Sequence, residues 1–104
     1  MIENKGGSEI RGGIEGEAAR LARIYISKLD KALNDLKVRD EEGGVGEVVE
    51  EARRYLSDSR YYLEGEAYLA ALAAASYAEG LLDSLRMLGL AEFEWPRGKS
   101  ELAP

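Results

Sequence analysis

The sequence predicts an all-α fold, an up-and-down antiparallel bundle of three helices. Apolar residues recur at helical spacing in three segments, and glycines interrupt the pattern between those segments. No segment shows the sustained alternation of apolar and polar residues that a half-buried strand requires. A chain of 104 residues is long enough for one domain with a single core and too short for two. Helices of this length with short connections favour antiparallel neighbours.

The first helix is expected to begin at Ile14. Residues 1–13 carry glycines scattered among charged residues and form no apolar period, so we expect a flexible leader there. From Ile14 onward, apolar residues spaced three and four apart predict an amphipathic helix of about six turns. The apolar stripe consists of Ala18, Ala22, Tyr25, Leu29, Ala32 and Leu36, and it is widened by Leu21 and Leu33.

Glycines separate the second helix from its neighbours. Gly43 and Gly44 are adjacent, and two glycines together cost too much backbone entropy for a helix interior. Gly65 follows the next apolar stripe, in the place where glycine commonly ends a helix. That second stripe consists of Val45, Val48, Val49, Ala52, Leu56, Ser59 and Leu63.

The third helix, expected over residues 66–88, has no single apolar face. Between Ala67 and Ala78, Ser76 is the only hydrogen-bonding side chain other than the tyrosine hydroxyls. A helix that is apolar nearly all round must be covered on several sides, and a three-helix monomer supplies only two neighbours. We therefore expect a homodimer that forms through this helix. The residues expected at the dimer contact are Ala71, Ala74, Ala75 and Ala78.

Gly89 is expected to end the third helix, which places the bundle domain at residues 14–90 and a C-terminal tail at residues 91–104. Trp95 lies within this tail. We expect its side chain to fold back onto the bundle, because an exposed indole would leave a large apolar surface in water.

Composition limits the kinds of function that the chain can have. The net charge is −6, and residues 39–66 carry nine acidic and four basic side chains, which argues against nucleic acid as a partner. Cysteine and histidine are both absent, so thiol chemistry, zinc ribbons and a histidine base are excluded. No apolar run is long enough to span a bilayer, and we expect a cytoplasmic protein. Few thermolabile residues and abundant Glu and Arg suggest a thermophile.

Two carboxylate pairs offer a candidate metal site. Glu47 and Glu50 are three residues apart, and Glu79 and Asp83 are four apart, so each pair shares a helix face. Together they could hold Mg²⁺, as in some all-helical nucleoside triphosphate pyrophosphohydrolases, although the second pair is one residue too long for that pattern. We favour the interpretation that both carboxylate pairs lie on solvent-exposed helix faces and bind no metal. The sequence therefore predicts no catalytic residue, no metal and no cofactor, and the chain is not expected to be an enzyme.

A candidate interaction surface combines tyrosines near the second turn with the polar line of the third helix. Its polar side chains can be explained as a solvent-facing line in which Asp83 and Arg86 pair three residues apart, or as a recognition surface for a partner. Its tyrosines can be explained as core and rim residues, or as platforms that stack a base. The surface consists of Tyr61, Tyr62, Tyr77, Glu79, Asp83 and Arg86.

Residues 58–89 resemble an archaeal uncharacterised family, domain of unknown function 357. The resemblance lies in an aromatic stretch, a glycine turn and an Ala-rich helix that ends in Arg-Met-Leu-Gly. It implies a small three-helix bundle and no assigned activity. The matching positions are Tyr61, Tyr62, Gly65, Ala71, Tyr77, Gly80, Leu82, Asp83, Arg86 and Gly89.

The turn at Gly65 is also similar to the helical hairpin of HEPN-type proteins, which bind nucleotides or act as RNases. Those RNases need a histidine that this chain lacks, so the similarity implies binding without cleavage. The sequence thus favours a non-catalytic protein-interaction module that self-associates. The alternatives are a HEPN-like nucleotide- or RNA-binding accessory domain and, third, a magnesium-dependent nucleotide pyrophosphohydrolase.

Overall fold

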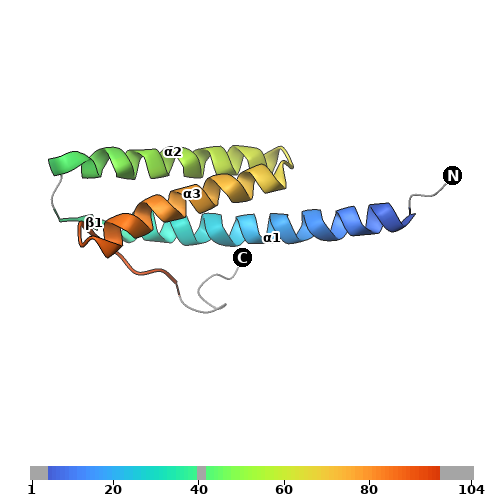
Figure 1. Ribbon diagram of the computed structural model, residues 1–104, viewed down its shortest axis with the longest axis horizontal. Coiled ribbons are helices and arrows are strands. Elements are labelled where there is room, and N and C mark those ends of the chain that lie inside the picture. Colours follow the sequence, from blue (N-terminus) through green and yellow to red (C-terminus); the bar gives the residue numbers. More distant parts are fainter. Residues whose placement is uncertain (1–4, 40–41, 97–104) are drawn as a thin grey trace.

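The chain folds as the predicted up-and-down bundle of three helices. The computed structural model describes residues 5–39 and 42–96. Helix α1 (Lys5–Asp35) is followed by a short 3₁₀ turn, η1 (Glu42–Gly44), and then by α2 (Val45–Glu64) and α3 (Tyr68–Met87). Successive helices run in opposite directions, and α3 packs against both α1 and α2 (Figure 1). The predicted fold class is therefore confirmed.

Helix α1 begins at Lys5, which corrects the expectation that residues 1–13 form a flexible leader. Residues 5–13 are helical, and residues 1–4 lie outside the described part of the chain. Glycine lowers helix propensity by about 1 kcal/mol relative to Ala, which disfavours a helix without excluding it. Because α1 has 31 residues and α2 and α3 have 20 each, its first part extends beyond the α2–α3 turn (Figure 1).

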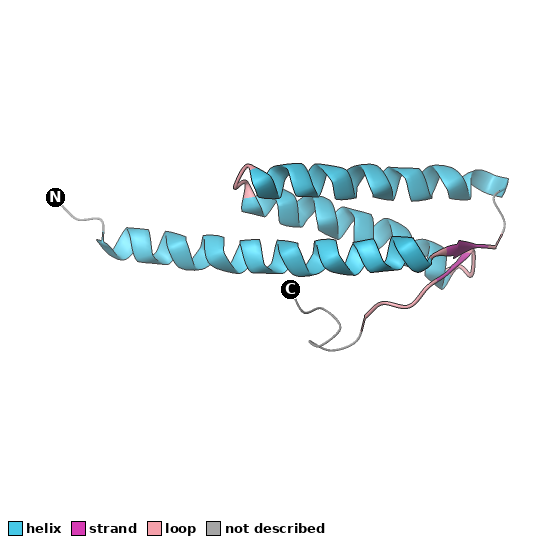
Figure 2. Cartoon of the chain, turned by 180° about the vertical axis from the view of Figure 1, so that it is seen from behind, coloured by secondary structure: helices cyan, strands magenta, loops and turns pink. Residues whose placement is uncertain are grey.

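A two-residue antiparallel ladder closes the end of the bundle where α1 ends (Figure 2). Strand β1 (Lys37–Val38) pairs with β2 (Ala91–Glu92), and the Arg39 N–H donates to the carbonyl of Leu90 at 3.0 Å. Two residues are too few to produce an alternating pattern, so the sequence predicted no strand here. The ladder ties the segment after α3 to the end of α1.

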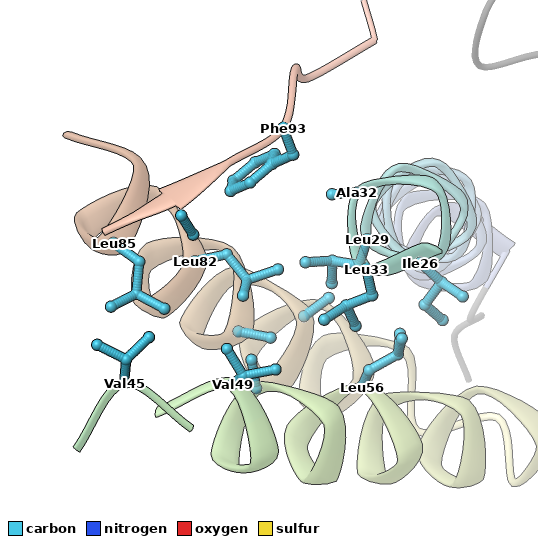
Figure 3. Packing of buried hydrophobic residues seen from close by; sticks show 14 residues of the cluster. Ile26, Leu29, Ala32, Leu33, Val45, Val49, Leu56, Leu82, Leu85 and Phe93 are labelled. Carbon is cyan, nitrogen blue, oxygen red and sulfur yellow. The ribbon is translucent and has the colours of Figure 1, made fainter. Parts of the chain in front are cut away.

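The core lies between the three helices and follows the predicted stripes. In α2 the buried residues are those predicted, with Val48 and Leu63 at the edge of the core. In Figure 3, Leu29 from α1, Val49 from α2 and Leu82 from α3 point into the space between the helices, and Phe93 covers one end of the cluster. The buried residues of α2 are Val45, Val49, Ala52, Leu56 and Ser59.

The alanines of α3 face the inside of the bundle. Ala71, Ala75 and Ala78 are completely buried, and Ala74 is 8% exposed. Small side chains let α1 and α2 approach α3 closely on two sides, which directs the alanines inward. The expectation that these four residues form a self-association contact is therefore wrong.

The α2–α3 turn confirms that α2 ends at Gly65, and it shows which residue bears the turn. Gly65 has φ −87°, whereas Glu66 takes the left-handed conformation with φ +64°. The Ala67 N–H donates to the Tyr62 carbonyl at 2.8 Å and closes the turn. Ser59, completely buried in α2, donates its hydroxyl to the Ala71 carbonyl at 2.7 Å and links the two helices just below the turn.

Candidate interaction surface

Helix α3 presents an exposed face that is almost free of charge. Nine of its residues are exposed, and Arg86 is the only charged one among them. In α2, by contrast, seven of the eleven exposed residues are charged. We call the uncharged part of this surface the outer face of α3. It consists of Leu69, Ala70, Ala73, Ser76, Tyr77, Gly80, Ser84 and Met87.

The outer face of α3 combines large apolar side chains with small ones. Leu69 is 66% exposed, Tyr77 52% and Met87 72%. A Cβ atom placed on Gly80 would meet no atom within 4 Å, so the packing of the chain itself does not require glycine there. We therefore treat the outer face of α3 as the candidate interaction surface.

The charged residues of α3 turn away from the outer face, toward α1 and the C-terminal segment. Glu79 accepts a hydrogen bond from Lys28 of α1 at 2.5 Å. Asp83 accepts from the Trp95 indole N–H at 2.8 Å and from Arg86 at 2.9 Å. The predicted pairing of Asp83 with Arg86 is confirmed, and both carboxylates of the polar line are engaged within the chain.

Trp95 folds back onto the bundle, as predicted, and its ring lies beneath the Lys28 ammonium. The Lys28 nitrogen is 4.8 Å from the Trp95 ring centroid and 5.2 Å from that of Tyr25, which is cation–π geometry. Phe93 packs edge-on against Trp95, with ring centroids 4.8 Å apart. The Trp95 hydrogen bond is the main cause that holds the pKa of Asp83 below its usual value. Burial opposes it, and Arg86 and the charge of Lys28 lower the pKa further. We call Lys28, Glu79, Asp83 and Trp95 the tail clamp.

The predicted interaction surface divides into separate parts. Tyr77 packs against Tyr55 of α2, with ring centroids 4.4 Å apart, on the side of α3 away from Lys28. Tyr61 and Tyr62 form an edge-to-face pair near the α2–α3 turn, with centroids 5.9 Å apart. The structure therefore does not bring the tyrosines together with the polar line of α3.

The two carboxylate pairs do not meet. Glu47 and Glu50 lie at the start of α2, where they border a shallow hollow, and Glu50 pairs with Arg53 at 3.7 Å. Glu79 and Asp83 belong to the tail clamp. Across residues 5–39 and 42–96, no group of three or more acidic side chains is placed to hold a metal ion. The arrangement expected for a magnesium-dependent pyrophosphohydrolase is absent from that part of the chain.

Two contacts were not predicted from the sequence: that of Lys28 with Glu79 and that of Trp95 with Asp83. Nothing in the sequence around Lys28 indicates a contact with α3, because lysines on the polar side of an amphipathic helix are usually solvated. Phe93 and Trp95 alternate with Glu92 and Glu94, a period of two that is typical of a segment with one buried side. That short pattern is a second signal, besides the large apolar surface of the indole, that places the tail against the bundle.

These features define a small all-α protein, a three-helix bundle with a clamped C-terminal segment and one uncharged outer helix face. Residues 24–91 match the model of a family described as a protein of unknown function (DUF357), and the chain belongs to this family. The matched residues include the whole outer face of α3 and end before Trp95. No curated protein and no solved structure matches the chain. None of the helices in the described residues is long and apolar enough to cross a membrane.

Proposed function

We propose that the protein is a non-catalytic protein-interaction module that self-associates through the outer face of α3. The observation that carries the proposal is the lack of charge on this face, in a protein whose other exposed helix surfaces are rich in charge. Charged residues keep a surface in water, and their depletion is typical of the centre of an interface. The self-association expected from the sequence thus moves from the buried alanines to the opposite side of the same helix.

The apolar side chains on this face predict a weak dimer. Leu69 and Met87 are 66% and 72% exposed, and fully burying such a side chain stabilises by about 1.5–3 kcal/mol. Covering the exposed fraction is then worth about 1–2 kcal/mol for each, or about 4–8 kcal/mol for the four side chains of two copies. Association costs about 4–15 kcal/mol in lost freedom of motion, so the net affinity is low.

Sedimentation velocity over micromolar to millimolar protein concentrations tests the proposal. We expect a concentration-dependent dimer for the unmodified chain. Ala73→Glu should remove it without changing the helical circular dichroism, because Ala73 is exposed at the middle of the face. Ser57→Glu is the matched control, since it places the same charge on an exposed position of α2 and should leave the dimer intact. A monomer at every concentration, or a dimer that Ala73→Glu does not weaken, would contradict the proposal.

The HEPN-like alternative rests on Tyr61, whose side chain is 73% exposed at the α2–α3 turn. An exposed ring can stack a base, but the acidic residues Asp58, Glu64 and Glu66 surround this one in the sequence. Titration with nucleotides while tyrosine fluorescence is followed distinguishes the two functions. Saturable binding that Tyr61→Ala abolishes would favour this alternative.

A further inference from the structure

We infer that the partner on the outer face of α3 is a second copy of the chain, packed antiparallel about a two-fold axis that crosses the outer face at the level of Ala78 along the helix. This inference rests on the proposed function and adds the orientation and register of the contact. A two-fold interface is self-complementary: when a residue of one copy contacts a given residue of the other, the reverse contact also forms. Four of the eight residues on the outer face, in two pairs, satisfy this condition.

Two pairs of residues on the outer face are equally spaced about Ala78. Leu69 lies nine residues before Ala78 and Met87 nine residues after it, and both are large and exposed. Ser76 and Gly80 lie two residues to either side, and both are small and exposed. An antiparallel partner therefore places each Leu69 against a Met87 at the ends of the contact. It places each Ser76 against a Gly80 near the middle, where small side chains let the two helices approach closely.

Charge at the ends of α3 favours the antiparallel over the parallel arrangement. The helix follows the exposed residues Glu64 and Glu66, and Arg86 is exposed in its last turn. In a parallel dimer the acidic ends would face each other, and so would the two arginines. In the antiparallel register the end of α3 that carries Arg86 lies beside the start of α3 in the partner subunit, which Glu66 precedes. Opposite charges then meet at both ends, and the two helix dipoles oppose each other favourably.

Introduced cysteines can report the orientation directly, because the chain has no cysteine of its own. One preparation carries Ala70→Cys and the other carries Ser84→Cys with an isotope label, and a short bis-maleimide cross-links nearby thiols. In the antiparallel register unlike cysteines are about 3 Å apart along the axis, whereas like cysteines are about 18–24 Å apart. We expect strong cross-linking between the two preparations and little within either one, which mass spectrometry resolves by the label. Ser57→Cys on α2 is the control that should not cross-link to either.

Each outcome decides the inference. Cross-links between unlike cysteines support the antiparallel register. Cross-links between like cysteines, Ser84→Cys to Ser84→Cys, would show a parallel dimer and overturn the inference while leaving the proposed self-association intact. A dimer in sedimentation with no cross-link from either position would place the contact elsewhere and overturn it as well. A chain that is monomeric at millimolar concentration would overturn the proposed function together with the inference.

Discussion

Replacing Asp83 by alanine should release Trp95 from the bundle. The substitution removes the acceptor of the indole hydrogen bond, which is 2.8 Å long, and the partner of Arg86. A hydrogen bond to a charged group contributes about 1.5–3 kcal/mol when it is well shielded from water. The Asp83 side chain is 34% exposed, which reduces that contribution to about 1 kcal/mol. The exposed pair with Arg86 adds a few tenths of a kcal/mol, so we expect a loss of about 1–1.5 kcal/mol in the free energy of unfolding.

Urea unfolding measures this loss, and the single tryptophan reports the local change. Because Trp95 is the only tryptophan in the chain, its fluorescence describes the tail clamp alone, while far-ultraviolet circular dichroism describes the helices. In folded Asp83→Ala we expect a red-shifted emission that acrylamide quenches more readily. Asp58→Ala is the control, since it removes an exposed carboxylate of α2 and should change stability by less than about 0.5 kcal/mol.

The pH dependence supplies a second readout of the same contact. The pKa of Asp83 is lowered in the folded chain, chiefly by the Trp95 hydrogen bond, from an ordinary value of 3.8. A lowered pKa means that the stabilisation is complete above the ordinary value and disappears as the pH falls through the folded-state value. Emission from Trp95 should therefore shift only in acid below pH 3.8, and the shift should be absent in Asp83→Asn. If Asp83→Ala matches the unmodified chain in stability and in quenching, Trp95 is not held as described.

Three further substitutions test the α2–α3 turn and the contact below it. Glu66→Gly should stabilise the chain by about 0.5–1 kcal/mol, because a non-glycine residue in the left-handed conformation is strained. Gly65→Ala should change stability by less than about 0.5 kcal/mol, because its Cβ would lie 3.6 Å from the Tyr61 carbonyl oxygen, an ordinary contact. Thermal unfolding compares the two, and a larger loss in Gly65→Ala would show that the glycine bears the turn. Ser59→Ala should lower the free energy of unfolding by about 1 kcal/mol, because it deletes the buried hydrogen bond to the Ala71 carbonyl. An unchanged midpoint of urea unfolding would show that this bond makes no net contribution to stability.

The sequence predicts the position of a residue correctly where its side chain strongly prefers either the core or the solvent. The apolar stripe of α2 predicted its buried face, including Ser59, because charged residues occupy most of the other positions of that helix. The end of α2 was predicted correctly from Gly65, because glycine commonly follows the last residue of a helix. The pairing of Asp83 with Arg86 was predicted correctly from their spacing of three residues along one helix. The start of α1 was not, because the glycines that argued against a helix lower its propensity by only modest amounts.

The sequence by itself determined that there are three helices, where the breaks between them fall and which side of α2 is buried. It also determined that α3 has more apolar surface than two neighbours can cover. Only the tertiary structure decided which side of α3 those neighbours take, because a helix that is apolar nearly all round carries no periodic signal that distinguishes one face from another. The packing of α1 and α2 directs the alanines inward and leaves Leu69, Ala73 and Gly80 exposed. Trp95 likewise acquires its partners, Lys28 and Asp83, from segments that meet only in the folded chain.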